Sequence, residues 1–318
     1  MEHSQLLDIV QRPLSPDTRL AVPASRAEYE RVNEILESEE AKYPQLWYDS
    51  MRSVAIVVAP PTPLHSGMTG ALLSTISDEV KFNAGISSDI TRNLSLYQES
   101  ASNGFTSRGL TTRAADGTLR YREGNRSTLM IAVEVGVSQS YDSLRAAISW
   151  SVCALCCRLG LAMSISEGSR GERPHIRYYA SIEEANAAAE EAEDEFRQQL
   201  LQHPYGPLIR YGATWFGRVR QVVLETYRRD DESAAETLLE PQQSFTIVQN
   251  GEFVGHNISP NLREVVLADC IPSHLLNGQE VQAVLVNFFY RDWFESQFQD
   301  FMVQTAVTRV RSYSKPVL

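Results

Sequence analysis

The stretch from Ser127 to Val137, STLMIAVEVGV, constrains the fold of this 318-residue chain more than any other. It is apolar almost throughout, whereas a strand with one side in water alternates apolar with polar residues. A continuous apolar run of this kind is typical of a central strand that is covered on both faces. We therefore predict an α/β (α+β) protein with a mixed sheet flanked by helices.

Segments on either side of this strand supply the expected layers. Residues 68–82 repeat apolar positions at helical spacing, and residues 140–159 are predicted to form a second helix. The run at 53–65 reads as a short strand stopped by prolines. Further strands are expected at 85–98, 111–121 and 173–181.

The N-terminal part is expected to be loosely ordered. Residues 1–24 carry three prolines among polar residues, which disfavours regular structure. A helix is predicted from about Ser25, with Glu28 as its capping-box partner three residues on. We assign 1–45 to an N-terminal arm and helix, and 46–205 to the core.

Residues 206–318 are predicted to form a β-rich C-terminal region that either makes a second domain or extends the sheet of the core. Asn250 and Gly251 form a dipeptide typical of a tight hairpin. The last segment, 292–314, gathers aromatic residues on one helical face and is predicted to close the chain as a helix. Strands are expected at 217–229, 264–272 and 281–290.

The charge balance disfavours a protein that coats a phosphate backbone. The formal net charge is −11, and nonspecific nucleic-acid affinity comes mainly from Lys and Arg. Much of the acid lies in residues 181–199, where it is expected to form a solvated helix face. Nucleic acid therefore stays open as a partner, and so does another protein.

Cysteine usage and the absence of a targeting pattern indicate an intracellular protein, cytoplasmic or nuclear. Cys153, Cys156 and Cys157 share one apolar stretch, with no second pair or nearby His at ligand spacing, so buried packing is favoured over zinc binding. No run approaches the roughly 18 apolar residues of a membrane span. The N-terminus lacks a basic segment followed by an apolar one.

Three carboxylates are arranged as metal-dependent phosphodiester hydrolysis requires. Such chemistry needs two or three acids around Mg²⁺ and a group that positions water. Glu79 lies on the helix before the sheet, Asp116 lies in the segment AADGTLRY, and Glu134 interrupts the apolar strand. Because a lone buried carboxylate is costly unless paired or metal-bound, Glu134 is the most informative of the three.

The segments AADGTLRY and TLMIAVEVGVSQSYDSLRAAISW resemble a family of intracellular proteins from filamentous fungi that carry a diverged PD-(D/E)XK, or restriction-endonuclease-like, domain. In that family an Asp-bearing strand precedes an apolar strand that ends in Glu-Val-Gly, and a helix with Leu and Trp follows. The resemblance covers residues 79–180, with a weaker match to about 230. It implies that Asp116 and Glu134 bind Mg²⁺ or Mn²⁺, with Glu79 as the helix acid.

The chain departs from the family pattern at the lysine that normally follows the Glu by two residues, because Gly136 stands there. That lysine orients water and stabilises transition-state charge. Gln139, at the polar position of the Ser-Gln signature, and Arg145 are the candidates to replace it. The family also often has an Asp where this chain has Ala147.

Structural roles compete with each of these assignments. Glu134 could pair with Arg120 or Arg145, and Asp116 followed by Gly117 is a common turn dipeptide. Glu79 could be a solvated helix residue. Ser138 and Ser140 are expected to cap the following helix, and Gln139 could simply be one of its first residues.

Two functions are compatible with these residues. The first is Mg²⁺-dependent cleavage of DNA or RNA, with Asp116, Glu134, Gln139 and Arg145 in the catalytic site. The second is a catalytically inactive nuclease-like scaffold that binds protein or nucleic acid, which the missing lysine and the acidic charge favour. Convergence of Asp116, Glu134 and a third acid would favour the enzyme. The resemblance also allows a dimer.

Overall fold

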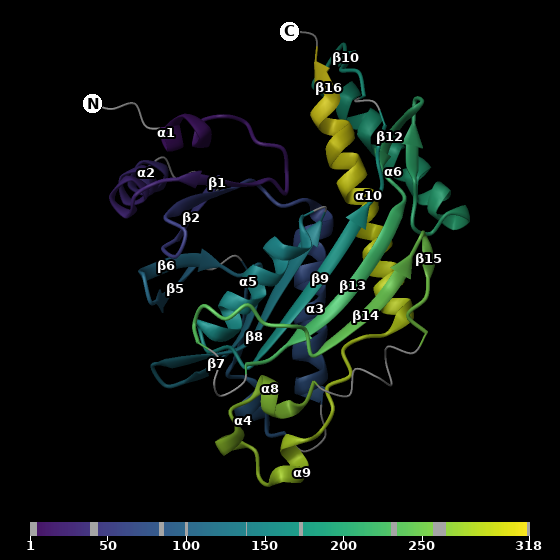
Figure 1. Ribbon diagram of the computed structural model, residues 1–318. Helices are drawn as coiled ribbons and strands as arrows, with labels where there is room; N and C mark the ends of the chain where they lie inside the picture. The colour runs from purple at the N-terminus through teal and green to yellow at the C-terminus, as the bar shows by residue number, and fades with distance from the viewer. Residues whose placement is uncertain are drawn as a thin grey trace.

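The computed structural model describes residues 5–38, 44–82, 86–98, 101–137, 139–171, 174–229, 234–256 and 265–316. Two sheets dominate these residues, and Figure 1 shows the smaller one at the N-terminal side of the larger. The smaller sheet is antiparallel, in the order β1-β3-β2-β6-β5. Its strands are β1 (Arg19–Pro23), β2 (Gln45–Asp49), β3 (Val54–Val58), β5 (Ala101–Thr106) and β6 (Gly109–Ala114).

The larger sheet has seven strands in the order β15-β14-β13-β9-β8-β7-β4. Only β8 and β9 among them pair in parallel, so the sheet is mixed, as predicted. Its strands are β4 (Leu94–Gln98), β7 (Gly117–Glu123), β8 (Arg126–Val137), β9 (Leu159–Glu167), β13 (Val219–Tyr227), β14 (Gln243–Gln249) and β15 (Glu252–Phe253).

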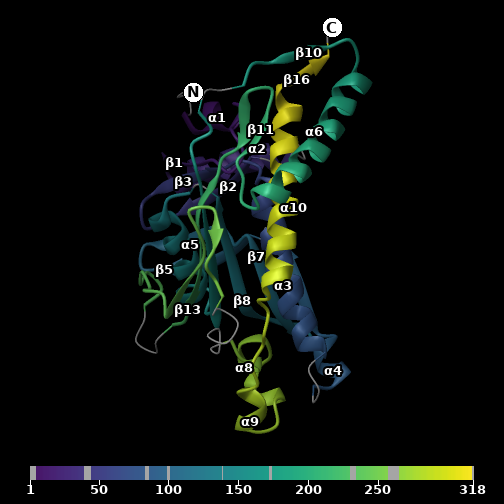
Figure 2. The same cartoon turned by 90° about the vertical axis from the view of Figure 1, so that its right-hand side faces the viewer.

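Helices cover both faces of this sheet, which confirms a mixed α/β architecture. The long helices are α3 (Pro63–Phe82), α5 (Tyr141–Cys153), α6 (Ile182–Gln202) and α10 (Arg291–Tyr313), and α2 (Arg26–Ser38) packs on the small sheet. α3 and α10 run side by side (Figure 2). The short elements are α1 (Gln5–Val10), α4 (Ser88–Thr91), β10 (Arg177–Tyr179), β11 (Leu208–Arg210), β12 (Ala213–Phe216), α8 (Leu267–Cys270), η1 (Ser273–Leu275), α9 (Gln279–Gln282) and β16 (Ser314–Pro316).

β8 is the central strand that its sequence predicts. Val133 and Val135 pack in one hydrophobic cluster with side chains of α3, whereas Ala132 packs with Ile148 of α5 in another. Because successive side chains of a strand point to opposite faces, Glu134 lies on the α5 face. Burial on both faces explains why the strand is apolar almost throughout.

The N-terminal residues do not form a loose arm. β1 pairs with β3 along its whole length, from Arg19 opposite Val58 to Pro23 opposite Val54. α2 begins after Ser25, whose hydroxyl accepts a hydrogen bond from the Glu28 amide, as predicted. The pairing of β1 fixes the position of Arg19, which becomes central to the site.

Four expected strands differ from the structure. Within 85–98 the chain forms the short helix α4 before β4. The segment 111–121 is two strands, because the chain bends at Asp116 and passes from β6 of the small sheet to β7 of the large one. Residues 265–272 and 281–290 form short helices and irregular segments, although many of their apolar side chains are buried. No helix in the described part of the chain is long and apolar enough to span a membrane.

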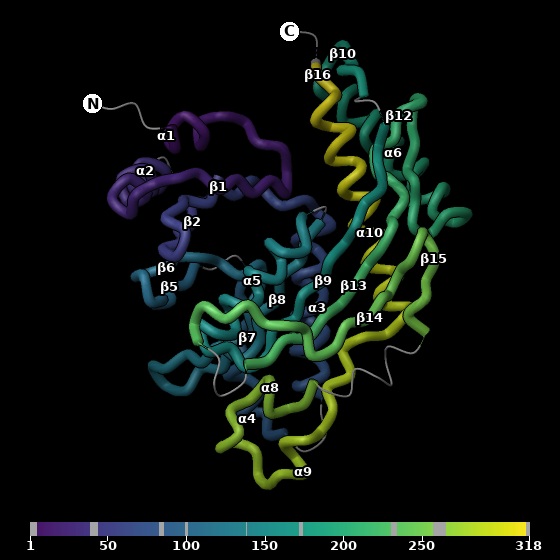
Figure 3. Tube along the Cα trace, in the orientation of Figure 1, coloured from purple at the N-terminus to yellow at the C-terminus, as the bar shows by residue number. Residues whose placement is uncertain are grey.

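The C-terminal region adds strands to the core sheet. β13 pairs with β9, and β14 pairs with β13 (Figure 3). The hairpin between β14 and β15 turns at Asn250 and Gly251, both with positive φ, which confirms the predicted turn. Phe294, Phe298 and Met302 form the buried face of α10.

Close packing of α5 on β9 depends on Gly160. A Cβ there would lie 2.6 Å from Ile148 Cγ1 and 2.8 Å from Val152 Cγ2, so Gly160→Ala is expected to cost about 1–3 kcal/mol through overpacking. Gly70, inside α3, is the matched control. A Cβ there meets mainly the flexible end of Gln98, and alanine is favoured over glycine in helices by about 1 kcal/mol. Urea unfolding should therefore shift in opposite directions for the two variants.

Candidate functional site

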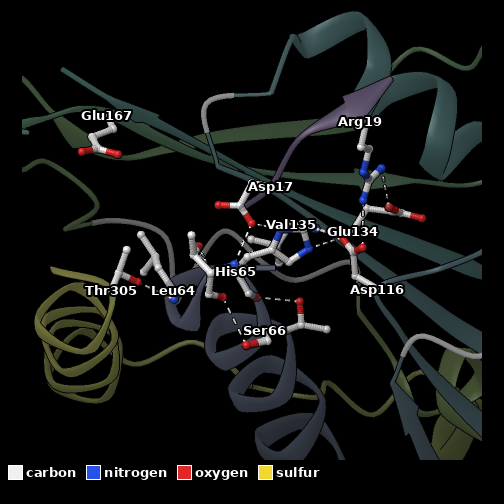
Figure 4. Close-up of polar contacts among 12 residues, drawn as sticks. Asp17, Arg19, Leu64, His65, Ser66, Asp116, Glu134, Val135, Glu167 and Thr305 are labelled. Atoms are coloured by element: carbon white, nitrogen blue, oxygen red, sulfur yellow. Dashed lines mark hydrogen bonds and ion pairs between the residues drawn. The ribbon is translucent and has the colours of Figure 1, made fainter. Parts of the chain in front are cut away.

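Strand pairing brings Asp116 and Glu134 together. Gly117 of β7 pairs with Val133 of β8, which places Asp116 beside Glu134 at the point where the chain enters the large sheet. The side chains are buried, with Asp116 7% and Glu134 0% exposed. Asp116 Oδ2 accepts a hydrogen bond of 2.8 Å from the Val135 amide (Figure 4). The two acids singled out from the sequence therefore share one buried centre.

A guanidinium from the N-terminal strand reaches both acids. Arg19 Nη2 lies 2.9 Å from Asp116 Oδ1, and Arg19 Nη1 lies 3.9 Å from Glu134 Oε2 (Figure 4). The same guanidinium stacks over the Trp47 ring at 5.0 Å. Arg19 thus supplies positive charge at the place where a metal ion was predicted.

His65, in the first turn of α3, adds a second cation. Its Nε2 lies 3.0 Å from Asp116 Oδ2, and its Nδ1 lies 3.3 Å from Asp17 Oδ1. Burial opposes protonation most strongly, but the charges and hydrogen bonds of Asp116 and Asp17 together outweigh it and raise the pKa of His65 to about 10. His65 is therefore an imidazolium at neutral pH, held between two carboxylates.

The pKa values of the two central carboxyls are shifted in opposite directions. Burial disfavours ionisation of Asp116, yet His65⁺ and Arg19 together hold its pKa well below the usual range. Burial, followed by the charge of Asp116, raises the pKa of Glu134 to about 8. Neither Glu134 oxygen has a hydrogen-bond partner among the described residues. Glu134 is thus mostly protonated at pH 7, beside an ionised Asp116.

Arg113 of β6 is the third cation near this centre. Burial lowers the pKa of its guanidinium, and Glu134 is the carboxylate that most strongly counteracts that effect. An arginine nevertheless stays charged in proteins. Positive side chains therefore balance the carboxylates of this region.

The other predicted site residues lie elsewhere. Glu79 accepts a hydrogen bond from the Tyr290 hydroxyl at 2.8 Å, and it follows His65 by 14 residues of α3, which is about 21 Å along the helix. Gln139 donates to Ser143 Oγ at 2.8 Å. Arg145 binds the Leu239 carbonyl and the Glu240 carboxylate. Within the described structure, none of the three side chains forms a hydrogen bond or ion pair with Asp116 or Glu134.

The structural alternatives are resolved in part. Glu134 is near arginine, but the partner is Arg19; Arg120 instead donates to Ser102 Oγ at 3.1 Å. Asp116 does lie at a bend, and its carboxylate also forms part of the buried centre. Ser140 caps α5 by accepting a hydrogen bond from the Ser143 amide. Ser138 lies outside the described residues.

Glu225 is a buried acid that the sequence did not single out. It is in register with Ala162 of β9, which is in register with Glu134, so it lies two strands away, about 10 Å. Its oxygens accept hydrogen bonds from Tyr141, Tyr227 and Ser244 at 3.1, 2.6 and 3.0 Å. Because hydroxyl donors satisfy Glu225, it does not act as a third ligand.

A divalent cation does not fit the centre as it stands. The charge that Mg²⁺ would bring is already supplied by Arg19 and His65, and added positive charge there would be repelled. Across the described ranges, no group of three or more His, Cys, Asp or Glu side chains could hold a metal ion. The unpartnered oxygens of Glu134 are a feature that a metal would satisfy.

The space beside the centre is too small for a substrate. A cavity of about 20 Å³ is lined by Asp17, Arg19, Trp47, His65 and Asp116, among others. A cavity of this size holds about one water molecule. A phosphodiester cannot enter unless the N-terminal strand moves.

Arg19, His65 and Asp17 carried no local signal in the sequence. Arg19 lies 97 residues from Asp116 in the chain and is placed by sheet pairing alone. Comparison with known proteins adds no assignment: no family model matches this chain, and no curated protein matches it.

Proposed function

We propose that this chain is a non-catalytic, nuclease-like scaffold that acts as a binding module. The observation that carries the proposal is the Arg19 guanidinium, which lies within 4 Å of both carboxylates of the centre. An internal cation at this place compensates the charge of the ionised Asp116, whereas a metal enzyme leaves that place to Mg²⁺ and substrate. The small adjoining cavity supports the same conclusion.

The order of elements supports a PD-(D/E)XK-like core. α3 is followed by β4, β7 and β8, which are neighbours in that order, and α5 then leads to β9, parallel to β8. Asp116 precedes β7 and Glu134 lies in β8, as the resemblance implies. Leu144 and Trp150 lie on α5. The fold is thus proposed to persist where the catalytic arrangement has been lost.

The missing lysine and the overall charge also favour binding over catalysis. Gly136 offers no cation, and a Cβ there would already lie 3.3 Å from Leu144 Cδ2. Gln139 and Arg145, the candidates to replace the lysine, are engaged with other partners. The net charge of −11 opposes nonspecific binding of nucleic acid.

Metal-dependent nuclease activity is the second candidate, and one observation favours it. Glu134 lies beside Asp116 with both oxygens unpartnered among the described residues, an arrangement that a metal would satisfy if β1 moved away. This candidate requires Mg²⁺ or Mn²⁺ and a DNA or RNA substrate. It also requires displacement of Arg19.

Calorimetric titration of Mg²⁺ and Mn²⁺ into the purified chain, with cleavage assays on single-stranded and duplex DNA and RNA, separates the two. We expect neither binding nor cleavage for the wild type. Cleavage that disappears in Glu134→Gln would overturn the scaffold proposal. Arg19→Met tests the second candidate directly, because metal binding gained by that variant would identify Arg19 as the group that excludes the ion.

A further inference from the structure

A second cavity lies between the small sheet and α5. Its volume is about 200 Å³. We call it the Arg113 pocket and define it by Tyr48, Ile56, Thr112, Arg113, Trp150 and Leu238, which are among the residues lining it. Tyr48, Ile56 and Leu238 give it apolar walls, and the other three bring polar atoms.

Arg113 brings a positive charge to this pocket. Its guanidinium forms no hydrogen bond or ion pair with any residue in the described ranges, and its Nε is buried without a partner. It stacks against the Trp47 ring at 5.7 Å. Buried arginines are normally paired, so an unpaired guanidinium at a cavity points to an anionic ligand.

Trp150 provides a second, independent indication. Its side chain, on α5, is only 8% exposed, and the indole Nε1 donor has no partner among the described residues. Buried indole N–H groups usually find an acceptor. Trp150 and Arg113 line the same cavity from opposite elements. Both unpartnered nitrogens are covered by protein atoms, so a ligand with acceptor oxygens satisfies both donors once it shifts the walls of the pocket.

The acids at the pocket do not fill this role. Asp49 Oδ1 accepts hydrogen bonds from the amides of Met51 and Arg52 at 2.9 and 3.2 Å. Glu236 accepts one from the Ser107 amide. Both acids are thus engaged with backbone donors, and in the described part of the chain neither forms an ion pair with Arg113.

We propose that the Arg113 pocket binds a small aromatic carboxylate, with its carboxylate on Arg113 and Trp150 Nε1 and its ring against the apolar walls. A single guanidinium forms two parallel hydrogen bonds with a carboxylate and matches its single negative charge. Benzene fills a cavity of about 150 Å³, so a one-ring acid suits this volume. The inference names what the scaffold binds and so rests on the proposed function.

Benzoate is the probe, titrated into the full-length chain and followed by ligand-observed NMR and by calorimetry. We expect saturable binding to the wild type, weakened at least tenfold in Arg113→Met and several-fold in Trp150→Phe, which keeps the ring but loses the donor. Benzamide, which has the same shape without the charge, should bind at least tenfold more weakly. Arg92→Met, an exposed arginine outside the pocket, should bind benzoate as the wild type does.

Thermal melts of each variant distinguish misfolding from loss of the binding site. Arg113→Lys keeps the positive charge and should therefore retain part of the affinity for benzoate. Equal affinity in the wild type and a folded Arg113→Met would overturn the proposal, as would a wild type that binds inorganic phosphate but not benzoate. If the wild type neither binds benzoate nor cleaves nucleic acid, the pocket assignment is overturned and the scaffold proposal stands. If the wild type cleaves nucleic acid and also binds benzoate, only the scaffold proposal is overturned.

Discussion

Replacing Arg19 by methionine is expected to lower the free energy of unfolding by about 3–5 kcal/mol at pH 7, because removal of one partner leaves a buried charge uncompensated. Methionine keeps much of the apolar stem but removes the guanidinium that lies 2.9 Å from Asp116. Asp116 would then rely on His65 and the Val135 amide. Urea unfolding followed by circular dichroism measures the loss.

Arg92→Met is the matched control, because the Arg92–Asp89 ion pair is exposed, with side-chain exposures of 70% and 73%. Exposed pairs contribute about 0–1 kcal/mol, so this variant should unfold close to the wild type. Adding Asp116→Asn to Arg19→Met should recover part of the lost stability, since the uncompensated charge disappears. Equal urea midpoints for Arg19→Met and Arg92→Met would contradict the role assigned to Arg19.

The central strand and the helices that cover it were predictable because the sequence patterns that indicate them are local. The apolar run of β8 and the helical periodicity of α3 and α5 reflect burial on the faces of the sheet. Glu134 is identified because a carboxylate in an apolar strand requires a partner, and Asp116 is identified through the family resemblance. Both acids lie in the buried centre.

β9 was missed because its apolar residues continue directly from α5. The chain ends the helix at Cys153, turns through Cys156 at a φ of 54°, and starts β9 at Leu159. Cys156 shows no sequence preference for that left-handed conformation, in which glycine or asparagine is usual. Periodicity could not divide one apolar run into a helix and a strand.

The partners of the acids were not predictable, because they come from distant parts of the chain. Arg19 lies in a segment that reads as an arm, and its strand forms only through pairing with β3. His65 stands at the start of a helix without any metal-binding spacing. Glu79 was assigned as the acid on the helix before the sheet, and Arg145 as a replacement for the missing lysine. Helix geometry and loop contacts place both away from Asp116.

Replacing Glu134 by glutamine is expected to stabilise the protein at pH 8 and leave its stability nearly unchanged at pH 4.5. The folded-state pKa of Glu134 is raised from 4.5 to about 8, so between these values the folded protein holds a proton that the unfolded chain releases. Wild-type stability therefore falls as pH rises through this window. At 1.36 kcal/mol per pKa unit, the gain of Glu134→Gln at pH 8 has an upper bound of about 5 kcal/mol.

The difference in free energy of unfolding between wild type and Glu134→Gln separates the contribution of Glu134 from those of the other titrating groups. The raised pKa of His65, about 10, makes stability fall between pH 6.5 and 10 in both proteins, and the lowered pKa of Asp116 makes it fall at acid pH in both. Glu225→Gln is the matched buried control: its carboxylate accepts three hydroxyl hydrogen bonds, so that variant should lose about 1–3 kcal/mol. If Glu134→Gln instead lost stability at pH 8, Glu134 would have to be ionised and paired, as a metal ligand would be.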